Sequence, residues 1–160
     1  MGDALAIALL EARGFTESDF AKSHPGGTLG RRLLLHIADI MHSGDGIPSV
    51  GADASLRDGL MEMTNKGLGM TVVVAADNTV VGIFTDGDLR RTLDQGVDVH
   101  DCGISEVMTS PCKVAHADML AAEALQIMQE KKINAIPIVD QRQHLIGAIS
   151  MHDLLRAGVV

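Results

Sequence analysis

The chain has 160 residues, 46% of them apolar and 21% charged, which is typical of a globular protein and excludes a disordered tail. A formal net charge of −8, only 2% aromatic residues and no run of Lys or Arg exclude recognition of nucleic acid and give no basis for binding an anionic membrane. Two cysteines are too few for a disulfide framework or a zinc site, and neither a membrane span nor a signal peptide is evident, so we expect a cytoplasmic protein with free thiols and no metal.

The first 35 residues differ from the rest of the chain. Residues 4–12 predict an apolar helix that ends at Gly14, and residues 15–22 predict a second helical turn capped by Thr16. A loop rich in Gly and Pro follows at 23–30. The first helix is apolar nearly all round and should be buried, but this short segment offers nothing to cover it. We therefore expect a domain cut through its middle, with the helix and the loop poorly ordered or packed on a neighbouring chain.

An internal repeat occupies the remainder of the chain. A shift of 65 positions, without a gap, places Asp58 on Glu123 and aligns a series of further pairs. These pairs are Met63 with Met128, Lys66 with Lys131, Gly82 with Gly147, Asp88 with Asp153 and Arg91 with Arg156. Upstream, residues 39–41 match 106–108 if the first copy carries two extra residues. We expect one domain over residues 36–98 and a second over 103–160, packed about a pseudo-two-fold axis because each unit is too small to bury a core alone.

Each copy predicts the same five elements in the same order. A short strand (47–50 or 113–115) precedes a helix with apolar residues at helical spacing, which are Leu56, Leu60 and Met63 in the first copy and Leu120, Leu125 and Met128 in the second. Two strands follow, at 70–75 and 80–84 or at 135–139 and 145–149, and a last helix opens at Asp86 or His152. The predicted fold class is α/β (α+β), with two βαββα repeats.

A hydroxyl and a carboxylate recur three residues apart where the last strand of each copy meets its last helix. The pairs are Thr85 with Asp88 and Ser150 with Asp153. The hydroxyl and the free N–H groups of the helix start could bind a phosphate, and the carboxylate could accept the vicinal hydroxyls of a ribose. The alternative is a capping box that serves only the helix. Occurrence at equivalent positions of both copies favours ligand binding, and His152, next to Asp153, could reach the phosphate of such a ligand.

These segments, 82–88 and 147–153, resemble the closing motif of CBS domains: a Gly, a hydrophobic residue, any residue, Thr or Ser, two residues and Asp. The resemblance implies a tandem CBS pair that binds an adenine nucleotide or a related ligand in the cleft between its copies. It also implies that Thr85 and Ser150 contact phosphate and that Asp88 and Asp153 contact ribose. The methionines at 41 and 108 fall near the cleft in the CBS pattern and could line a base. The remaining histidines show no ligand spacing, and we expect them at the surface or the edge of the core; they are His36, His42, His100, His116 and His144.

The first 35 residues are similar to the end of the sugar isomerase (SIS) domain of arabinose-5-phosphate isomerases, through segments 2–6, 19–21, 23–27 and 29–31. That family interconverts ribulose 5-phosphate and arabinose 5-phosphate to supply Kdo for lipopolysaccharide or capsule. The His of its His-Pro-Gly-Gly segment, here His24, is catalytic there, and an imidazole that titrates near neutrality suits the proton transfers. Without the family match, a loop histidine that caps a carbonyl would be the preferred explanation of His24. The phosphate-binding loops of the SIS domain are missing, so we expect no catalysis by the chain alone and no catalytic cofactor.

Two interpretations of the pair remain open. In the first, it is a regulatory module of an arabinose-5-phosphate isomerase that senses a small phosphorylated ligand, either an adenine nucleotide or CMP-Kdo. In the second, it is a structural CBS pair that mediates oligomerisation and binds nothing. Both include self-association, as a dimer of CBS pairs within a parent homotetramer. An independent enzyme is disfavoured because the sequence shows no nucleophile–base pair.

Overall fold

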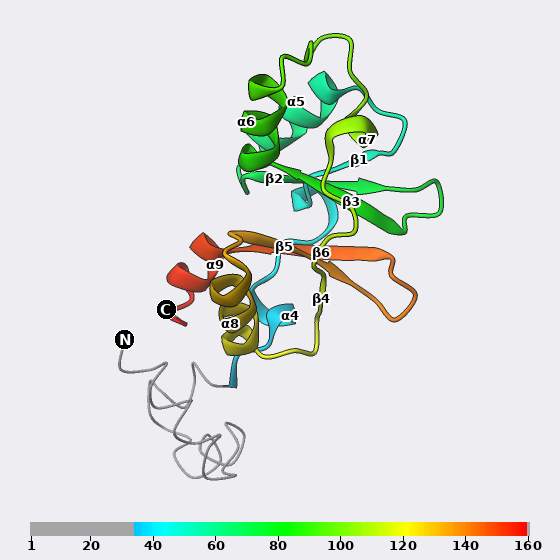
Figure 1. Cartoon of the computed structure of the whole chain (residues 1–160). Helices are drawn as coiled ribbons and strands as arrows, with labels where there is room; N and C mark the ends of the chain where they lie inside the picture. The colour runs from blue at the N-terminus through cyan, green and yellow to red at the C-terminus, as the bar shows by residue number, and fades with distance from the viewer. Residues whose placement is uncertain (1–33, 160) are drawn as a thin grey trace.

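The computed structural model describes residues 34–159, which form two halves that each contain one three-stranded sheet (Figure 1). The sheet of the first half has the order β1-β2-β3 and that of the second the order β4-β5-β6. The predictions for residues 4–12 and 23–30, and for His24, lie outside the described residues. Within the described part, no helix is both long enough and apolar enough to cross a membrane.

The elements of the two halves follow each other in the same order along the chain. The first series is α4 (Ile37–Ile40), a 3-10 turn η1 (Gly44–Gly46), β1 (Ser49–Gly51), α5 (Leu56–Lys66), β2 (Met70–Val74), β3 (Val80–Thr85) and α6 (Asp86–Asp94). The second series is α7 (Ile104–Val107), β4 (Ala115–His116), α8 (Ala121–Lys131), β5 (Ala135–Val139), β6 (Leu145–Ser150) and α9 (Met151–Arg156). The predicted βαββα repeat is confirmed. Leu120, expected within the helix, is instead the residue that precedes α8.

Strand pairing repeats with the offset of 65 positions found in the sequence. In each half the middle strand runs parallel to the first strand and antiparallel to the third. Met70 pairs with Thr85 in the first half, and Ala135 pairs with Ser150 in the second. Even the irregularity recurs, because the register shifts after Val73 in one sheet and after Ile138 in the other. Equivalent hydrophobic patterns therefore produce equivalent sheets.

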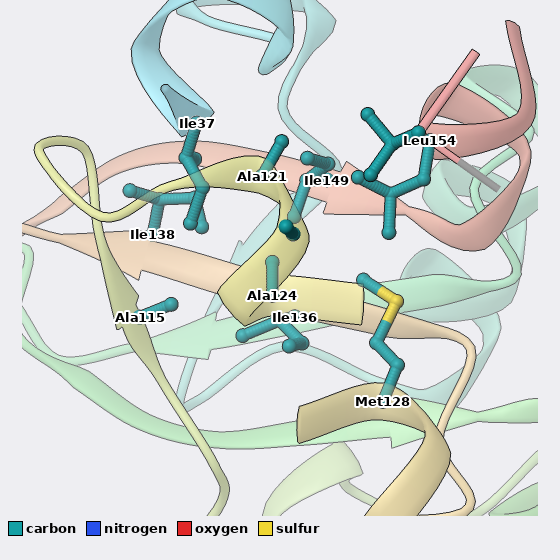
Figure 2. Close-up of a cluster of buried hydrophobic side chains, with 11 residues drawn as sticks. Ile37, Ala115, Ala121, Ala124, Met128, Ile136, Ile138, Ile149 and Leu154 are labelled. Carbon is teal, nitrogen blue, oxygen red and sulfur yellow. The ribbon is translucent and has the colours of Figure 1, made fainter. Parts of the chain in front are cut away.

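The short helices α4 and α7, which the sequence analysis did not predict, pack on the opposite half. Ile37 of α4 donates its N–H to the carbonyl of Met119 at 2.8 Å, and Ile104 of α7 donates to the carbonyl of Ala54 at 3.1 Å. Ile37 is fully buried in the core of the second half, beside Ile138 of β5 (Figure 2). Ile104 is fully buried in the core of the first half. The core of each half thus contains an isoleucine from the short helix at the start of the other sequence copy.

The two sheets also share a core and a symmetric contact at their hairpins. Val80 donates its N–H to the carbonyl of Gln143 at 3.0 Å, and Leu145 donates to the carbonyl of Asn78 at 3.1 Å. An offset of 65 positions converts the first bond into the second, so the pseudo-two-fold axis passes between these hairpins. Apolar residues of both sheets form one buried cluster there: Met70, Val72, Ile83, Ala135, Leu145 and Ala148. Burial of this shared apolar surface holds the halves together.

Candidate functional site

Both hydroxyl–carboxylate motifs form capping boxes at the start of a helix. At α6, the Thr85 hydroxyl accepts the N–H of Asp88 at 3.4 Å, and Asp88 Oδ2 accepts the N–H of Thr85 at 2.9 Å. At α9, the Ser150 hydroxyl accepts the N–H of Asp153 at 3.3 Å, and Asp153 Oδ2 accepts the N–H of Ser150 at 2.8 Å. The local alternative considered for these motifs is therefore present in the structure. It satisfies N–H groups that a helix start leaves free.

The second oxygen of each carboxylate binds the segment that arrives from the other half. Asp88 Oδ1 accepts the hydroxyl of Thr109 at 2.6 Å and also pairs with the guanidinium of Arg91. Asp153 Oδ1 lies 2.8 Å from Nε2 of His42. Thr109 follows α7 and His42 follows α4, at equivalent positions of the two copies. Because both carboxylates are buried and engaged, the ribose contact expected of them requires an exchange of these partners.

The environment of Asp153 keeps it ionised. Burial of the carboxyl opposes ionisation, but hydrogen bonds from Ser150 and His42 outweigh it and hold the pKa of Asp153 below its ordinary value. A carboxylate only accepts hydrogen bonds, so Nε2 of His42 carries the proton of the 2.8 Å contact. The interaction is a charge-assisted link between the segment after α4 and the start of α9.

The motif glycines make room for methionines that cross from the other half. A Cβ atom at Gly82 would lie 2.7 Å from Sδ of Met108, and one at Gly147 would lie 2.5 Å from Sδ of Met41. Both distances are too short for any side chain, so glycine is the residue that allows this approach. The structure places both methionines against these strands, and their contact with a ligand base stays a prediction.

A cleft of about 440 Å³ opens between the halves beside the start of α6. The first half contributes Leu68, Gly69, Ile83, Thr85, Asp86, Gly87, Asp88 and Arg91 to its walls, and the rest are Thr109 and the run Lys132, Ile133, Asn134 and Ala135. Thr85 and Asp88 therefore lie together on one cleft, and their contact with a ligand stays a prediction. Its volume falls in the range of about 300–1,000 Å³ typical of small-molecule sites.

The equivalent motif of the second half differs in the burial of its hydroxyl residue, while its carboxylate, Asp153, is about as buried as Asp88. The Ser150 side chain is buried, whereas Thr85 is only half-buried. Met151, at the position of Asp86, packs against the apolar core of the second half and donates its N–H to the carbonyl of Asn134 at 2.8 Å. His152 is exposed on α9. The sequence treats the two motifs alike, but they differ in how much of each a ligand can reach.

Sequence reasoning missed Lys132 and Asn134 in the cleft wall and the two residues that bind the motif carboxylates, Thr109 and His42. A signal for Lys132 was present, because the offset of 65 positions aligns it with Gly67 and so exposes a difference between the copies. For His42 and Thr109 the signal was weaker. They align with each other only through the two-residue offset, and no local pattern indicates a partner as distant as Asp153.

Two intertwined α/β repeats, each closed by a capped helix beside a shared interface, define a tandem repeat module with a small-molecule cleft. The chain belongs to the CBS domain family, which matches residues 37–95 and 104–160. The CBS pair and the fold predicted from the resemblance are confirmed. The match begins at residue 37, so the assignment of the first 35 residues to an SIS domain stays a prediction.

Curated relatives match over the whole chain. Arabinose 5-phosphate isomerase KdsD of Pseudomonas aeruginosa is 61% identical over 160 residues, which are 100% of this chain and 49% of that protein. KdsD of Escherichia coli strain K12 is 58% identical over 160 residues, 100% of this chain and 48% of that protein. The chain thus spans about half the length of the curated relatives it matches.

Solved CBS proteins share the fold. CBS domain protein PAE2072 from Pyrobaculum aerophilum, complexed with AMP, has a TM-score of 0.67 at 19% identity and covers 79% of this chain and 100% of its own. The CBS domain pair of MJ0100, in complex with 5′-methylthioadenosine and S-adenosyl-L-methionine, has a TM-score of 0.67 at 21% identity and covers 76% and 93%. At these identities the likeness establishes the fold alone.

Proposed function

We propose that this CBS pair is the ligand-sensing regulatory part of an arabinose-5-phosphate isomerase, and that an adenine nucleotide or CMP-Kdo binds in the cleft beside Thr85. The observation that carries the proposal is the cleft of about 440 Å³ at the start of α6, with polar and charged side chains on its walls. Relatives named KdsD supply the enzyme class, and solved CBS pairs bound to AMP or S-adenosyl-L-methionine supply the ligand class.

The start of α6 favours the phosphate of such a ligand. The first N–H groups of a helix and the positive end of its dipole attract anions. Gly87, in the first turn of α6, leaves space on the cleft wall, since a Cβ there would meet its nearest atom only at 3.6 Å. Asp88 would accept ribose hydroxyls by exchanging its bond with Thr109. The overall charge of −8 opposes an anion weakly, because salt screens charges beyond about 8–10 Å.

The isomerase reaction itself belongs to the rest of the proposed enzyme. His24 would take part in the proton transfers between the aldose and the ketose in the intact protein. Ligand binding in the CBS pair would then set the activity of that catalytic domain. The product of the proposed isomerase is a precursor of Kdo, so CMP-Kdo is a candidate ligand as a feedback signal.

Self-association has its own support on the surface of the first half. Met61 of α5 is 55% exposed and Leu93 of α6 is 57% exposed. Beside Met61, a groove of about 360 Å³ is lined by Arg57, Leu60, Thr64, Asn65, Val99 and His100. An exposed apolar surface of this kind suits a dimer of CBS pairs, in the sensing and in the structural interpretation alike.

Calorimetric titration of the purified chain with AMP, ATP and CMP-Kdo tests the proposal. We expect saturable heat from at least one of the three. If none binds at millimolar concentration, the sensing function is wrong and the structural interpretation stands. Gly87→His on the cleft wall and Arg90→His outside it connect the heat to the Thr85 cleft.

A further inference from the structure

The helices α5 and α8 end in the same backbone conformation but with different residues. Gly67 follows α5 with φ 72° and ψ 21°, and Lys132 follows α8 with φ 56° and ψ 45°. Both values lie in the left-handed region, where glycine is the favoured residue because it lacks a Cβ. Backbone geometry thus accounts for Gly67 but not for Lys132. A non-glycine residue held in an unfavourable conformation at a cleft indicates a role for its side chain.

Lys132 is placed on the cleft wall that faces the start of α6. It lines the cleft together with Thr85 and Asp86, although it comes from the other half. Within residues 34–159 its ammonium group enters no ion pair, whereas Arg91, the other cation of the cleft, is paired with Asp88. Asp86 lies in the first turn of α6, where the helix dipole offsets a negative charge. Lys132 is therefore the cation of the cleft wall without a carboxylate partner in the described part.

The position equivalent to this cleft in the second half lacks the same features. Gly67 stands where Lys132 would be, so the second motif has no lysine at that position and its equivalent cation is Arg156, at the position of Arg91. Met151 replaces Asp86 and packs, partly buried, against the core, and His42 binds Asp153 as Thr109 binds Asp88. The second motif thus has an apolar residue in place of Asp86 and a glycine in place of Lys132.

We propose that Lys132 binds the anionic group of the ligand and that the Thr85 cleft is the single ligand site of the pair, filled by one phosphorylated ligand per chain. This rests on the proposed sensing function and adds to it the stoichiometry and the cation. An ammonium group is a compact charge suited to a phosphate. The buried Ser150 and Asp153 then serve to fix the start of α9 and the segment after α4.

The test uses two variants of Lys132 and one matched control. Lys132→Gly removes the charge and restores the residue that the backbone favours. Lys132→Gln removes the charge but keeps a long side chain. Lys131→Ala removes a neighbouring charge at the end of the same helix, outside the cleft wall. Each is titrated calorimetrically with AMP, ATP and CMP-Kdo, and with the matching neutral nucleosides, adenosine and cytidine.

We expect one equivalent of nucleotide per wild-type chain. Both Lys132 variants should bind the nucleotide about tenfold to a hundredfold more weakly, as expected for loss of a charge-assisted contact, with unchanged affinity for the nucleoside. Lys131→Ala should bind like the wild type. Lys132→Gly should melt no lower than the wild type, so that the loss of affinity cannot arise from unfolding.

Three results would overturn the inference while leaving ligand sensing intact: two equivalents of nucleotide per chain, full affinity in both Lys132 variants, or an equal loss for nucleotide and nucleoside. Absence of binding to the wild-type chain by any of the three nucleotides is a different failure. It rejects the proposed function, and the assignment of Lys132 with it.

Discussion

His42 and Asp153 are 111 positions apart in the chain, yet Nε2 of His42 lies 2.8 Å from Oδ1 of Asp153. The contact connects the segment after α4 with the capping box of α9, the last helix. Its counterpart in the first half joins Thr109 to Asp88 at 2.6 Å. A hydrogen bond to a motif carboxylate therefore holds the segment after α4 and the segment after α7. The donor is the imidazole of His42 in the first case and the hydroxyl of Thr109 in the second.

Removal of the Asp153 charge should destabilise the fold in a manner that depends on pH. The folded-state pKa of Asp153 is lowered, so the folded protein binds this proton more weakly than the unfolded chain. The stabilisation is present above the ordinary carboxyl pKa, near 4, and is lost as pH falls through the lower folded-state pKa. We expect Asp153→Asn to reduce the free energy of unfolding by about 1.5–3 kcal/mol at pH 7. Urea denaturation at pH 7 and below pH 4 should show this difference shrinking, while exposed Asp118→Asn shows little at either pH. A difference independent of pH would contradict the ionic assignment.

Thr should substitute for His42 because the equivalent position already uses Thr. We expect His42→Ala to lower the free energy of unfolding by about 1–3 kcal/mol, since Asp153 then keeps a buried, unsatisfied oxygen. His42→Thr should recover most of that loss by donating a hydroxyl as Thr109 does to Asp88. Denaturant midpoints of the two variants provide the measurement. Equal destabilisation by both would show that the two crossing segments are not equivalent.

A methyl group at either motif glycine should be costly. At Gly82 the new Cβ would lie 2.7 Å from Met108 Sδ and 2.8 Å from the carbonyl oxygen of Thr109, which cannot move as a side chain can. We expect Gly82→Ala to lower stability by about 1–3 kcal/mol, as overpacking does. Gly87→Ala is the matched control, because its Cβ would meet ordinary contacts at 3.6 and 3.7 Å. Thermal melts compare the two variants, and equal melting temperatures would contradict the packing described.

A side chain at Gly87 should obstruct the Thr85 cleft. The second half carries His152 at this position, so Gly87→His copies a residue that the fold already accepts. We expect nucleotide affinity to fall by roughly tenfold or more, which corresponds to at least about 1.4 kcal/mol, without loss of stability. Arg90→His places the same side chain at an exposed neighbouring position outside the cleft wall and should bind normally. Unchanged affinity in Gly87→His would place the ligand elsewhere.

Most of the fold could be predicted from the sequence because the repeat can be read directly from the order of residues. The offset of 65 positions that aligns Gly82 with Gly147 also relates the strand registers of the two sheets, down to the shifts after Val73 and Ile138. It could not predict that α4 and α7 change halves. That arrangement depends on which core Ile37 and Ile104 fill. A single apolar residue in a four-residue helix gives no sequence pattern that distinguishes one core from the other.

The candidate site was predicted only in part for a similar reason. The hydroxyl–carboxylate spacing placed both motifs at helix starts, and only the structure shows that Thr85 lines a cleft while Ser150 is buried. The surroundings of the second motif include Met151, which packs against the core of the second half. They also include His42, which binds Asp153 although it lies 111 positions away in the chain. Both effects are tertiary, so two equal motifs acquire unequal surroundings.

Because α4 and α7 exchange cores, we expect the two copies to fold as one unit. A half expressed alone, cut between the sequence copies, would carry its opening helix with no core to receive it. Its own core would lack the isoleucine that fills it, Ile104 in one case and Ile37 in the other. Two such identical half-chains could complete each other only by trading helices, as in a domain-swapped dimer. The covalent link between the copies thus converts what would be a concentration-dependent association into a single intramolecular folding event.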